Sequence, residues 1–162
     1  MRARPWLIQL ALLTVVFLAV NGWQTRSHLR GEALPGGLRP TLSGGVLDLH
    51  TLVGRPTLVA VWAPWCSVCA ASSSNLRWVQ RIVGARAQVV SIAMAYEDVG
   101  SVRRYVEAHR ATYPVVLGDS ALADALHVTA FPTLYFLDAQ GRVKHSSVGY
   151  TTAVGMLARL VL

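Results

Sequence analysis

The chain has 162 residues, of which 53% are hydrophobic and 14% charged, and its formal net charge is +7. This length allows one ordinary domain rather than two well-packed cores, and the hydrophobic content excludes a wholly disordered chain. The two cysteines, Cys66 and Cys69, are too few for a disulfide-stapled miniprotein or a four-thiolate zinc site. Three interpretations of the two cysteines remain: a redox pair, half of a metal site or a tight structural bridge.

The amino-terminal residues 1–23 are expected to form a membrane anchor. No charged residue occurs between Pro5 and Thr25. An apolar helix of this length, at ~1.5 Å per residue, spans roughly 30 Å, the thickness of one bilayer core. Arg2 and Arg4 precede it and favour a cytoplasmic amino terminus. A cleavable signal peptide is the alternative, although no Ala-x-Ala cleavage site follows the apolar run.

The rest of the chain is expected outside the cytoplasm. Residues 24–37 are rich in proline and glycine and predict a linker, and residues 38–162 predict one globular domain. The predicted location is a bacterial inner membrane, crossed once through residues 5–23, with the domain in the oxidising periplasm. The basic residues of the domain are scattered without a dense run, so a nucleic-acid partner is not expected.

The domain alternates the sequence patterns of strands and helices. Residues 57–62 and 88–95 are runs of β-forming apolar residues, which predict two buried strands. The segment 66–83 has helical apolar spacing and is followed by Gly84, a stop signal, and 98–110 predicts an amphipathic helix. A helix that connects two strands implies that the strands are parallel.

The second half of the domain is expected to close the sheet. The predicted elements are, in order, a short strand, a short helix and two antiparallel strands joined by a turn, at 115–117, 119–126, 133–138 and 142–148. A last helix, capped by Thr151 or Thr152, is expected to face inward with Val154, Leu157, Ala158 and Val161. The predicted fold is α/β, a three-layer α/β/α sandwich with a mixed central sheet.

The reactive residues are concentrated in the segment Trp62–Cys69, where a predicted strand ends and a helix begins. Cys66 falls at the helix start, where unpaired N–H groups and the helix dipole favour an anion. We therefore expect the pKa of its thiol to lie below the free value of ~8.5. Cys69, one turn further in, is expected to stay a buried thiol. Cys66 can then attack a substrate disulfide and Cys69 can resolve the mixed disulfide, while the reverse sequence oxidises a dithiol.

A bare Cys-x-x-Cys pair also occurs in zinc and haem sites, so the surrounding residues matter. No histidine follows Cys69, which excludes attachment of c-type haem. Pro132 stands just before a predicted strand, where proline is tolerated, and a cis bond there would let the backbone pair with an extended substrate. The candidate substrate-binding residues are Trp65, Phe131 and Thr133, although packing in the core is an equal alternative for Phe131.

These motifs resemble those of the thioredoxin superfamily, which implies a thioredoxin-like fold. The segment Leu42–Cys69 is similar to the membrane-anchored TlpA/ResA/DsbE group, and Asp138–Arg142 with Val148–Thr151 to the ScsD-type branch associated with copper tolerance. The resemblance implies that the first cysteine is the nucleophile, the second the resolving cysteine, and Pro132 a cis-proline. It also implies a transmembrane thiol carrier of the DsbD/CcdA type that keeps the protein reduced.

The chain departs from the family pattern around the cysteines. Thioredoxins place a buried Asp where this chain has Ala60, and ResA-type proteins place a Glu where it has Ser72. A nearby carboxylate disfavours a thiolate and can relay its proton. Without one, we expect a low pKa for Cys66 and a reduction potential more oxidising than that of thioredoxin. Proton exchange at Cys69 is expected to use water or the hydroxyls of Ser72–Ser74.

The favoured function is a membrane-tethered thiol–disulfide oxidoreductase that faces the periplasm, reduces exported proteins and needs no cofactor or metal. An oxidant of secreted proteins is one alternative. A Cu(I)-binding chaperone is another, with Cys66, Cys69 and a distant histidine as ligands, but Sco-like proteins have a longer cysteine spacing. The acidic pocket of haem-maturation reductases is not evident near Val128–Thr133, which makes that role less favoured. A peroxiredoxin is not expected, because no Thr or Ser and Pro stand at the required spacing before either cysteine.

Overall fold

The structure is a computed structural model that describes residues 9, 12–16 and 29–161. Most of the expected membrane anchor, residues 1–23, lies outside these residues; residues 9 and 12–16 are helical. Within the described ranges, every helix is too short or too polar to cross a bilayer. The anchor therefore stays a prediction.

A mixed five-stranded sheet forms the centre of the domain, with strands in the order β5-β4-β3-β6-β7. Strand β3 pairs in parallel with β4 and antiparallel with β6, which confirms the predicted mixed sheet. Every residue of β3 is buried, because this central strand is covered on both faces. The strands are β3 (Thr57–Trp62), β4 (Gln88–Ala93), β5 (Val115–Leu117), β6 (Thr133–Leu137) and β7 (Val143–Val148).

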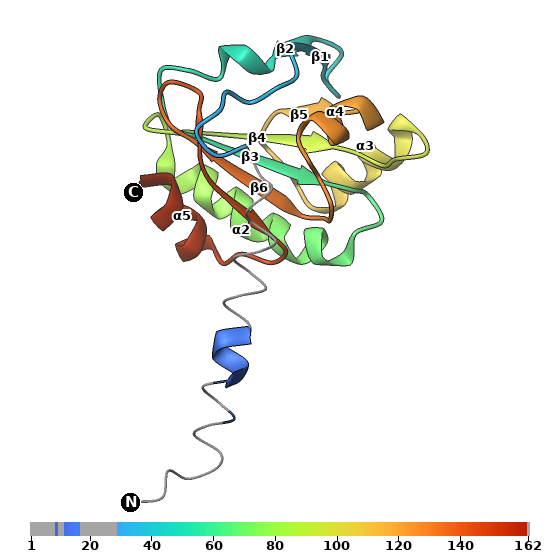
Figure 1. Cartoon of the computed structure of the whole chain (residues 1–162). Coiled ribbons are helices and arrows are strands. Elements are labelled where there is room, and N and C mark those ends of the chain that lie inside the picture. The colour runs from blue at the N-terminus through green and yellow to red at the C-terminus, as the bar shows by residue number, and fades with distance from the viewer. Residues whose placement is uncertain (1–8, 10–11, 17–28, 162) are drawn as a thin grey trace, which may run out of the picture.

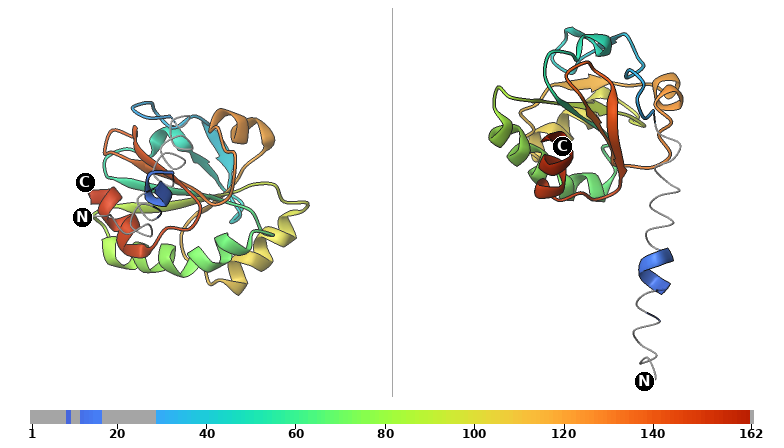
Figure 2. Two further views of the ribbon diagram at one scale, coloured as in Figure 1. Left: turned by 60° about the horizontal axis from the view of Figure 1, so that its bottom comes forward. Right: turned by 60° about the vertical axis from the view of Figure 1, so that its left-hand side comes forward.

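Helices and a small hairpin cover the two faces of the sheet (Figure 1, Figure 2). One face carries α2 (Ser67–Val83), α3 (Val99–Ala108) and α5 (Ala153–Val161), whose core residues pack against alternate residues of β3. The other face carries α4 (Ser120–Ala125), the 3-10 helix η1 (Leu49–Thr51) and the hairpin of β1 (Leu38–Pro40) with β2 (Val46–Asp48). The two faces and the sheet make the three predicted layers.

Helix α2 has the predicted extent. Its N-cap is Cys66 and its C-cap is Gly84, whose φ of 51° lies in the left-handed region that glycine adopts readily. Two other elements end earlier than predicted. Strand β4 stops before Ala95, which has a φ of 49°, and α3 stops before Arg110, which has a φ of 48°. Neither residue type signals a left-handed backbone, so the sequence predicted longer elements.

The described part of the expected linker, residues 29–37, packs against the domain. The amide of Gly31 donates to the Val143 carbonyl at 2.8 Å, and the Val143 amide donates to the Glu32 carbonyl at 2.8 Å. Leu34 is 1% exposed and belongs to the core cluster on the η1 face. This segment therefore adds to the sheet edge beside β7, although nothing in its composition signals burial. The domain boundaries at 24, 37 and 38 stay predictions.

The inward face predicted for α5 is wrong. The hydroxyl of Thr152 accepts the Gly155 amide at 3.2 Å, as expected for a cap, but Met156 and Leu160 are the buried residues. Val154 and Val161 are 71% and 80% exposed, Ala158 is exposed and Leu157 is only partly buried. The helix carries two overlapping apolar stripes, and the stripe with the longer Met156 side chain faces α2 and the sheet.

Candidate active site

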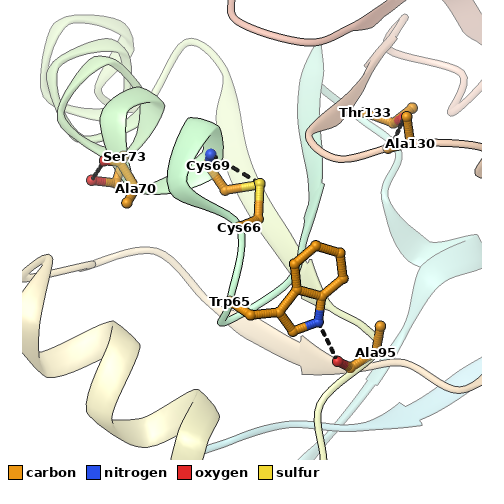
Figure 3. Close-up of a disulfide and its surroundings, with 8 residues drawn as sticks. All are labelled: Trp65, Cys66, Cys69, Ala70, Ser73, Ala95, Ala130 and Thr133. Atoms are coloured by element: carbon orange, nitrogen blue, oxygen red, sulfur yellow. Dashed lines mark hydrogen bonds between the residues drawn. A yellow bond between two sulfur atoms is a disulfide. The ribbon is translucent and has the colours of Figure 1, made fainter.

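The cysteine pair lies where β3 passes into α2 (Figure 3). Cys66 has extended backbone angles, φ −82° and ψ 107°, and its Sγ accepts the backbone N–H of Cys69 at 3.1 Å. This is the geometry of a helix N-cap, with sulfur in the place of the usual side-chain oxygen. A negative charge on this sulfur is therefore stabilised by an N–H group of the first helical turn and by the helix dipole.

Cys66 and Cys69 form a disulfide, with their Cα atoms 5.2 Å apart. Cys66 is 6% exposed and Cys69 is 3% exposed, so the predicted order of burial is confirmed but the contrast is small. Both sulfurs belong to a core cluster with Trp62 and Val102 of α3. The pair is therefore largely buried, and surface residues around Cys66 border it.

Trp65 is the largest such surface residue, and it is fixed in place at two points. Its indole Nε1–H donates to the Ala95 carbonyl at 2.8 Å, as Figure 3 shows, and its ring meets Phe131 edge-on with centroids 5.7 Å apart. Trp65 nevertheless keeps 68% of its surface exposed. The left-handed Ala95 directs the carbonyl toward the indole. The result is an exposed aromatic surface next to Cys66 that is held in one orientation.

The loop before β6 lies at the same end of the sheet as the cysteine pair. The register pairs Thr133 with Val61, one residue before β3 ends, so Phe131 and Pro132 face the loop that carries Trp65. The Phe131–Pro132 peptide bond is cis, as the resemblance of the motifs implied. Phe131 is partly buried and contacts both the η1-side core and the cluster around the cysteines.

Thr133, unlike the other two candidate substrate-binding residues, lies in the interior. It is completely buried, and its hydroxyl donates to the Ala130 carbonyl at 2.7 Å. The Pro132 carbonyl accepts the Gly149 amide at 2.8 Å. Thr133 therefore holds the loop in shape from inside, while Trp65 is exposed and Phe131 is partly exposed.

The interior behind the cysteine pair contains no carboxylate within the described residues. Ala60 is 1% exposed and packs against α2 and α5. Ser72 is 2% exposed, and its hydroxyl has no hydrogen-bond partner in the described part of the chain. By contrast, Ser73 donates to the Ala70 carbonyl at 2.7 Å and Ser74 to the Ala71 carbonyl at 3.5 Å. Among the three hydroxyls proposed for proton exchange, only that of Ser72 is buried and uncommitted.

Aromatic rings pack behind the site, on the side of α3. Trp62 stacks on Tyr105 with centroids 4.1 Å apart, and Tyr105 lies 4.3 Å from the ring of His109. Burial raises the pKa of Tyr105, with a smaller contribution from Tyr113, so its phenol stays neutral. These rings support the loop between β3 and α2 from behind.

A cleft of about 490 Å³ adjoins Trp65 between the site and α3. Tyr96, Glu97 and Arg104 are among its lining residues, together with Trp65 itself. The sequence did not indicate Tyr96 and Glu97, because they follow the end of a strand in a segment without periodicity. They are nevertheless adjacent to the left-handed Ala95 that holds Trp65, so the cleft and the indole share one supporting loop.

The Cu(I) alternative requires a histidine beside the two cysteines. In the ranges that the structure describes, no three side chains of His, Cys, Asp or Glu are grouped closely enough to hold a metal ion. The ring of His109 instead packs against the ring of Tyr105, at a tilt of 53°. The described residues therefore supply no third ligand for a copper ion at the pair.

Comparison with known proteins places these features in a family. The family model described as "AhpC/TSA family" matches residues 31–146. Thioredoxin-like protein YneN of Bacillus subtilis is 26% identical over 169 residues, which cover 98% of each chain. Thiol:disulfide interchange protein DsbE of Pseudomonas aeruginosa is 29% identical over 150 residues, which cover 85% of this chain and 79% of that protein.

A solved structure shows the same fold. The crystal structure of a protein described as a thiol:disulfide interchange protein DsbE from Chlorobium tepidum superimposes with a TM-score of 0.74 at 24% identity. The match covers 83% of this chain and 99% of that one. The fold is therefore thioredoxin-like, as the resemblance of the motifs implied.

Proposed function

The chain belongs to the AhpC/TSA family, and we propose that within this thioredoxin-like family it reduces disulfide bonds of exported proteins. It is a thiol–disulfide oxidoreductase of the thioredoxin fold, with Cys66 and Cys69 as its Cys-x-x-Cys pair. The observation that carries the exchange reaction, in either direction, is the position of Cys66 as the N-cap of α2, with its Sγ facing the Cys69 amide.

The two cysteines take successive roles in the proposed reaction. The Cys66 thiolate attacks one sulfur of a substrate disulfide, a mixed disulfide forms, and the other substrate sulfur leaves as a thiolate and takes up a proton. Cys69 then loses its proton and attacks the Cys66 sulfur. The second substrate thiolate leaves, and the Cys66–Cys69 disulfide forms. Two electrons have passed to the substrate, and the pair needs reduction before the next cycle.

The substrate is proposed to lie as an extended segment across Trp65 and the loop that contains Phe131 and Pro132. An extended peptide can bond to exposed backbone while its side chains contact neighbouring surfaces. Trp65 supports this role because it is 68% exposed and yet held by the Ala95 carbonyl and the Phe131 ring. A fixed aromatic surface loses little conformational entropy when a substrate covers it.

We further propose the cellular setting expected from the sequence. Residues 1–23 anchor the chain in a bacterial inner membrane, residues 24–37 lead to the domain 38–162 in the periplasm, and a DsbD/CcdA-type carrier returns the pair to its dithiol form. The ScsD-type branch remains the proposed subgroup. Asp138–Arg142 carries that resemblance, and in the fold this segment is the β6–β7 turn.

Trapping of the mixed disulfide tests the exchange reaction. In a Cys69→Ala variant of the full chain, Cys66 can form the mixed disulfide but cannot be released by its partner, so exported proteins should accumulate in covalent, reductant-sensitive adducts. Cys66→Ala is the matched control and should trap none. Absence of adducts in Cys69→Ala, or equal adducts in both variants, would contradict the proposed exchange.

An oxidant of secreted proteins is the second candidate, and one observation favours it. The interior behind the pair lacks a carboxylate within the described residues, and the Cys66 sulfur accepts an N–H bond. Both features stabilise the thiolate, and a stabilised reduced form makes the disulfide a stronger oxidant. The reductase and the oxidant differ in the redox form of the cysteine pair that predominates in the cell. A reductase must be held as the dithiol, and an oxidant as the disulfide.

A further inference from the structure

Arginines from two elements line a cleft far from the cysteine pair. The cleft has a volume of about 560 Å³, within the range of small-molecule sites, and lies between α2 and the segment after α3. It is lined by Arg77, Gln80, Arg81, Arg110 and Thr112. Arg77 is 11 residues after Cys66, roughly 16 Å along the helix, so the cleft is separate from the redox site.

Two hydrogen bonds hold the walls of the cleft together. The Thr112 hydroxyl donates to Gln80 Oε1 at 2.7 Å, and Gln80 Nε2 donates to the Thr112 carbonyl at 3.4 Å. This contact joins α2 to the segment that carries Arg110. The guanidinium groups of Arg77, Arg81 and Arg110 are therefore brought to one cavity by a fixed contact between elements.

Within the described part of the chain, no ion pair balances the positive charge of the cleft. The described residues form ion pairs through Arg39, Arg104 and Arg142, and through none of the three cleft arginines. None of the described residues that line the cleft is acidic. Arg77 and Arg81 are four residues apart on α2, a spacing at which like charges repel.

One guanidinium group also has an unmet hydrogen bond. Arg77 Nε is buried, and no acceptor for it occurs among the described residues. Tyr113 feels the charge of Arg77 but does not supply an anion, because burial raises the pKa of Tyr113 to about 12 against that charge. A buried donor without a partner costs free energy, which an anionic ligand would recover.

Arg110 has an unusual backbone conformation. Its φ of 48° lies in the left-handed region, where glycine is favoured and a long side chain is strained. Its amide donates to the Glu107 carbonyl in the turn that ends α3. The chain thus carries an exposed arginine at a position where glycine would fold more easily, and this arginine completes the cleft.

We propose that this cleft binds a phosphate-type oxyanion, either free or as the headgroup phosphate of an anionic lipid. Arginine is suited to this ligand because its planar group gives paired N–H donors that match the oxygens of phosphate. The Thr112 side chain, which also lines the cleft, adds a neutral polar group. The site is independent of thiol exchange and holds no group that the redox reaction uses.

Titration of the full chain in uncharged detergent micelles tests this site. The arginine Nε–Hε signals are followed by NMR in one series with inorganic phosphate and in a second with phosphatidylglycerol added to the micelles. The signals of Arg77, Arg81 and Arg110 should shift together and saturate. Saturation with inorganic phosphate shows that a free anion is enough to occupy the cleft. Saturation in the lipid series alone shows that the bound phosphate is that of a lipid headgroup.

Three variants separate binding from folding. Arg81→Gln should weaken binding at least ~10-fold, or about 1.4 kcal/mol. Arg103→Gln removes the same charge from an exposed position of α3 that does not line the cleft, and should bind as the unmodified chain does. Arg110→Gly should weaken binding while raising the Tm of the ligand-free protein. The proposal is overturned if neither titration saturates at the three arginines, or if Arg103→Gln weakens binding as much as Arg81→Gln.

Discussion

The first turn of α2 and the C-terminal half of the same helix carry different chemical groups. The first turn presents a sulfur to a backbone N–H group, and no acidic residue occupies it. The C-terminal half packs Leu76 and Val79 against Met156 of α5, and its outer surface carries Arg77 and Arg81. One end therefore stabilises an anion through the backbone, while the other provides packing and side-chain cations.

This difference shows how one helix supports a reactive group without a charged partner. The sequence between Asp48 and Glu97 contains no acidic residue, so no carboxylate on α2 competes for the dipole or opposes the thiolate. Rigidity comes from the apolar contacts further along the helix. Reactivity and stability are therefore expected to respond to different substitutions.

The largest expected effect on stability is at the contact between α5 and the C-terminal half of α2. Met156→Ala should lower the free energy of unfolding by about 2–5 kcal/mol, because it opens a cavity where α5 packs on α2. Val154→Ala, on the exposed side of α5, should have almost no effect. Denaturant unfolding measures both, and a similar loss in the two variants would show that the assigned inward face of α5 is wrong.

A smaller effect is expected on the reactivity of the first turn. Val68 is 42% exposed, and Val68→Glu places a carboxylate near the Cys66 thiolate. Repulsion should raise the pKa of the Cys66 thiol by roughly 0.2–0.7 units, equivalent to about 0.3–1 kcal/mol. The thiolate then forms at higher pH, so the alkylation rate of the reduced protein by iodoacetamide should reach half its maximum at a higher pH.

Val68→Gln is the control for this change, since it alters shape and polarity without adding charge. It should keep the pH midpoint of the unmodified chain. If the Glu and Gln variants share one midpoint, electrostatics at the first turn do not control Cys66, and the contrast between the two ends of α2 loses its basis.

The smallest expected effect concerns the proton of Cys69. Ser72→Ala should slow resolution of the mixed disulfide only a few-fold, because water remains an alternative route for the proton. Its stability should change by less than about 0.5 kcal/mol, because the Ser72 hydroxyl has no partner to lose among the described residues. Stopped-flow kinetics with a mixed-disulfide substrate and denaturant unfolding give the two values.

Ser73→Ala is the matched variant one residue further along. It removes the hydrogen bond to the Ala70 carbonyl and should cost about 0.5–1.5 kcal/mol of stability with no change in the resolving rate. The opposite pattern, slow resolution in Ser73→Ala alone, would assign proton exchange to a different hydroxyl.

The sequence predicted elements that carry a strong local signal. Residues 57–62 are continuously apolar, and Gly84 marks a helix stop, so β3 and α2 have nearly their expected bounds. The position of Cys66 at the start of α2 followed directly. The cis peptide bond before Pro132 was also expected, because the resemblance of the motifs implied it.

Other features depend on contacts that no local pattern reveals. The β1–β2 hairpin was missed, because its strands have only three residues each and remain largely exposed. The burial of Leu34 depends on the core that receives it. The bond from Trp65 depends on the left-handed Ala95, and the arginine cleft on a contact between Gln80 and Thr112, residues far apart in the chain.

The redox state of the Cys66–Cys69 pair in the cell tests the central claim most directly. Cells that express the full chain are quenched with acid, and free thiols are labelled with a mass-shifting alkylating reagent before separation. A reductase of exported proteins must be held ready, so most of the chain should carry two labels. A chain that is mainly unlabelled, with its disulfide intact at steady state, would contradict the proposed reductase.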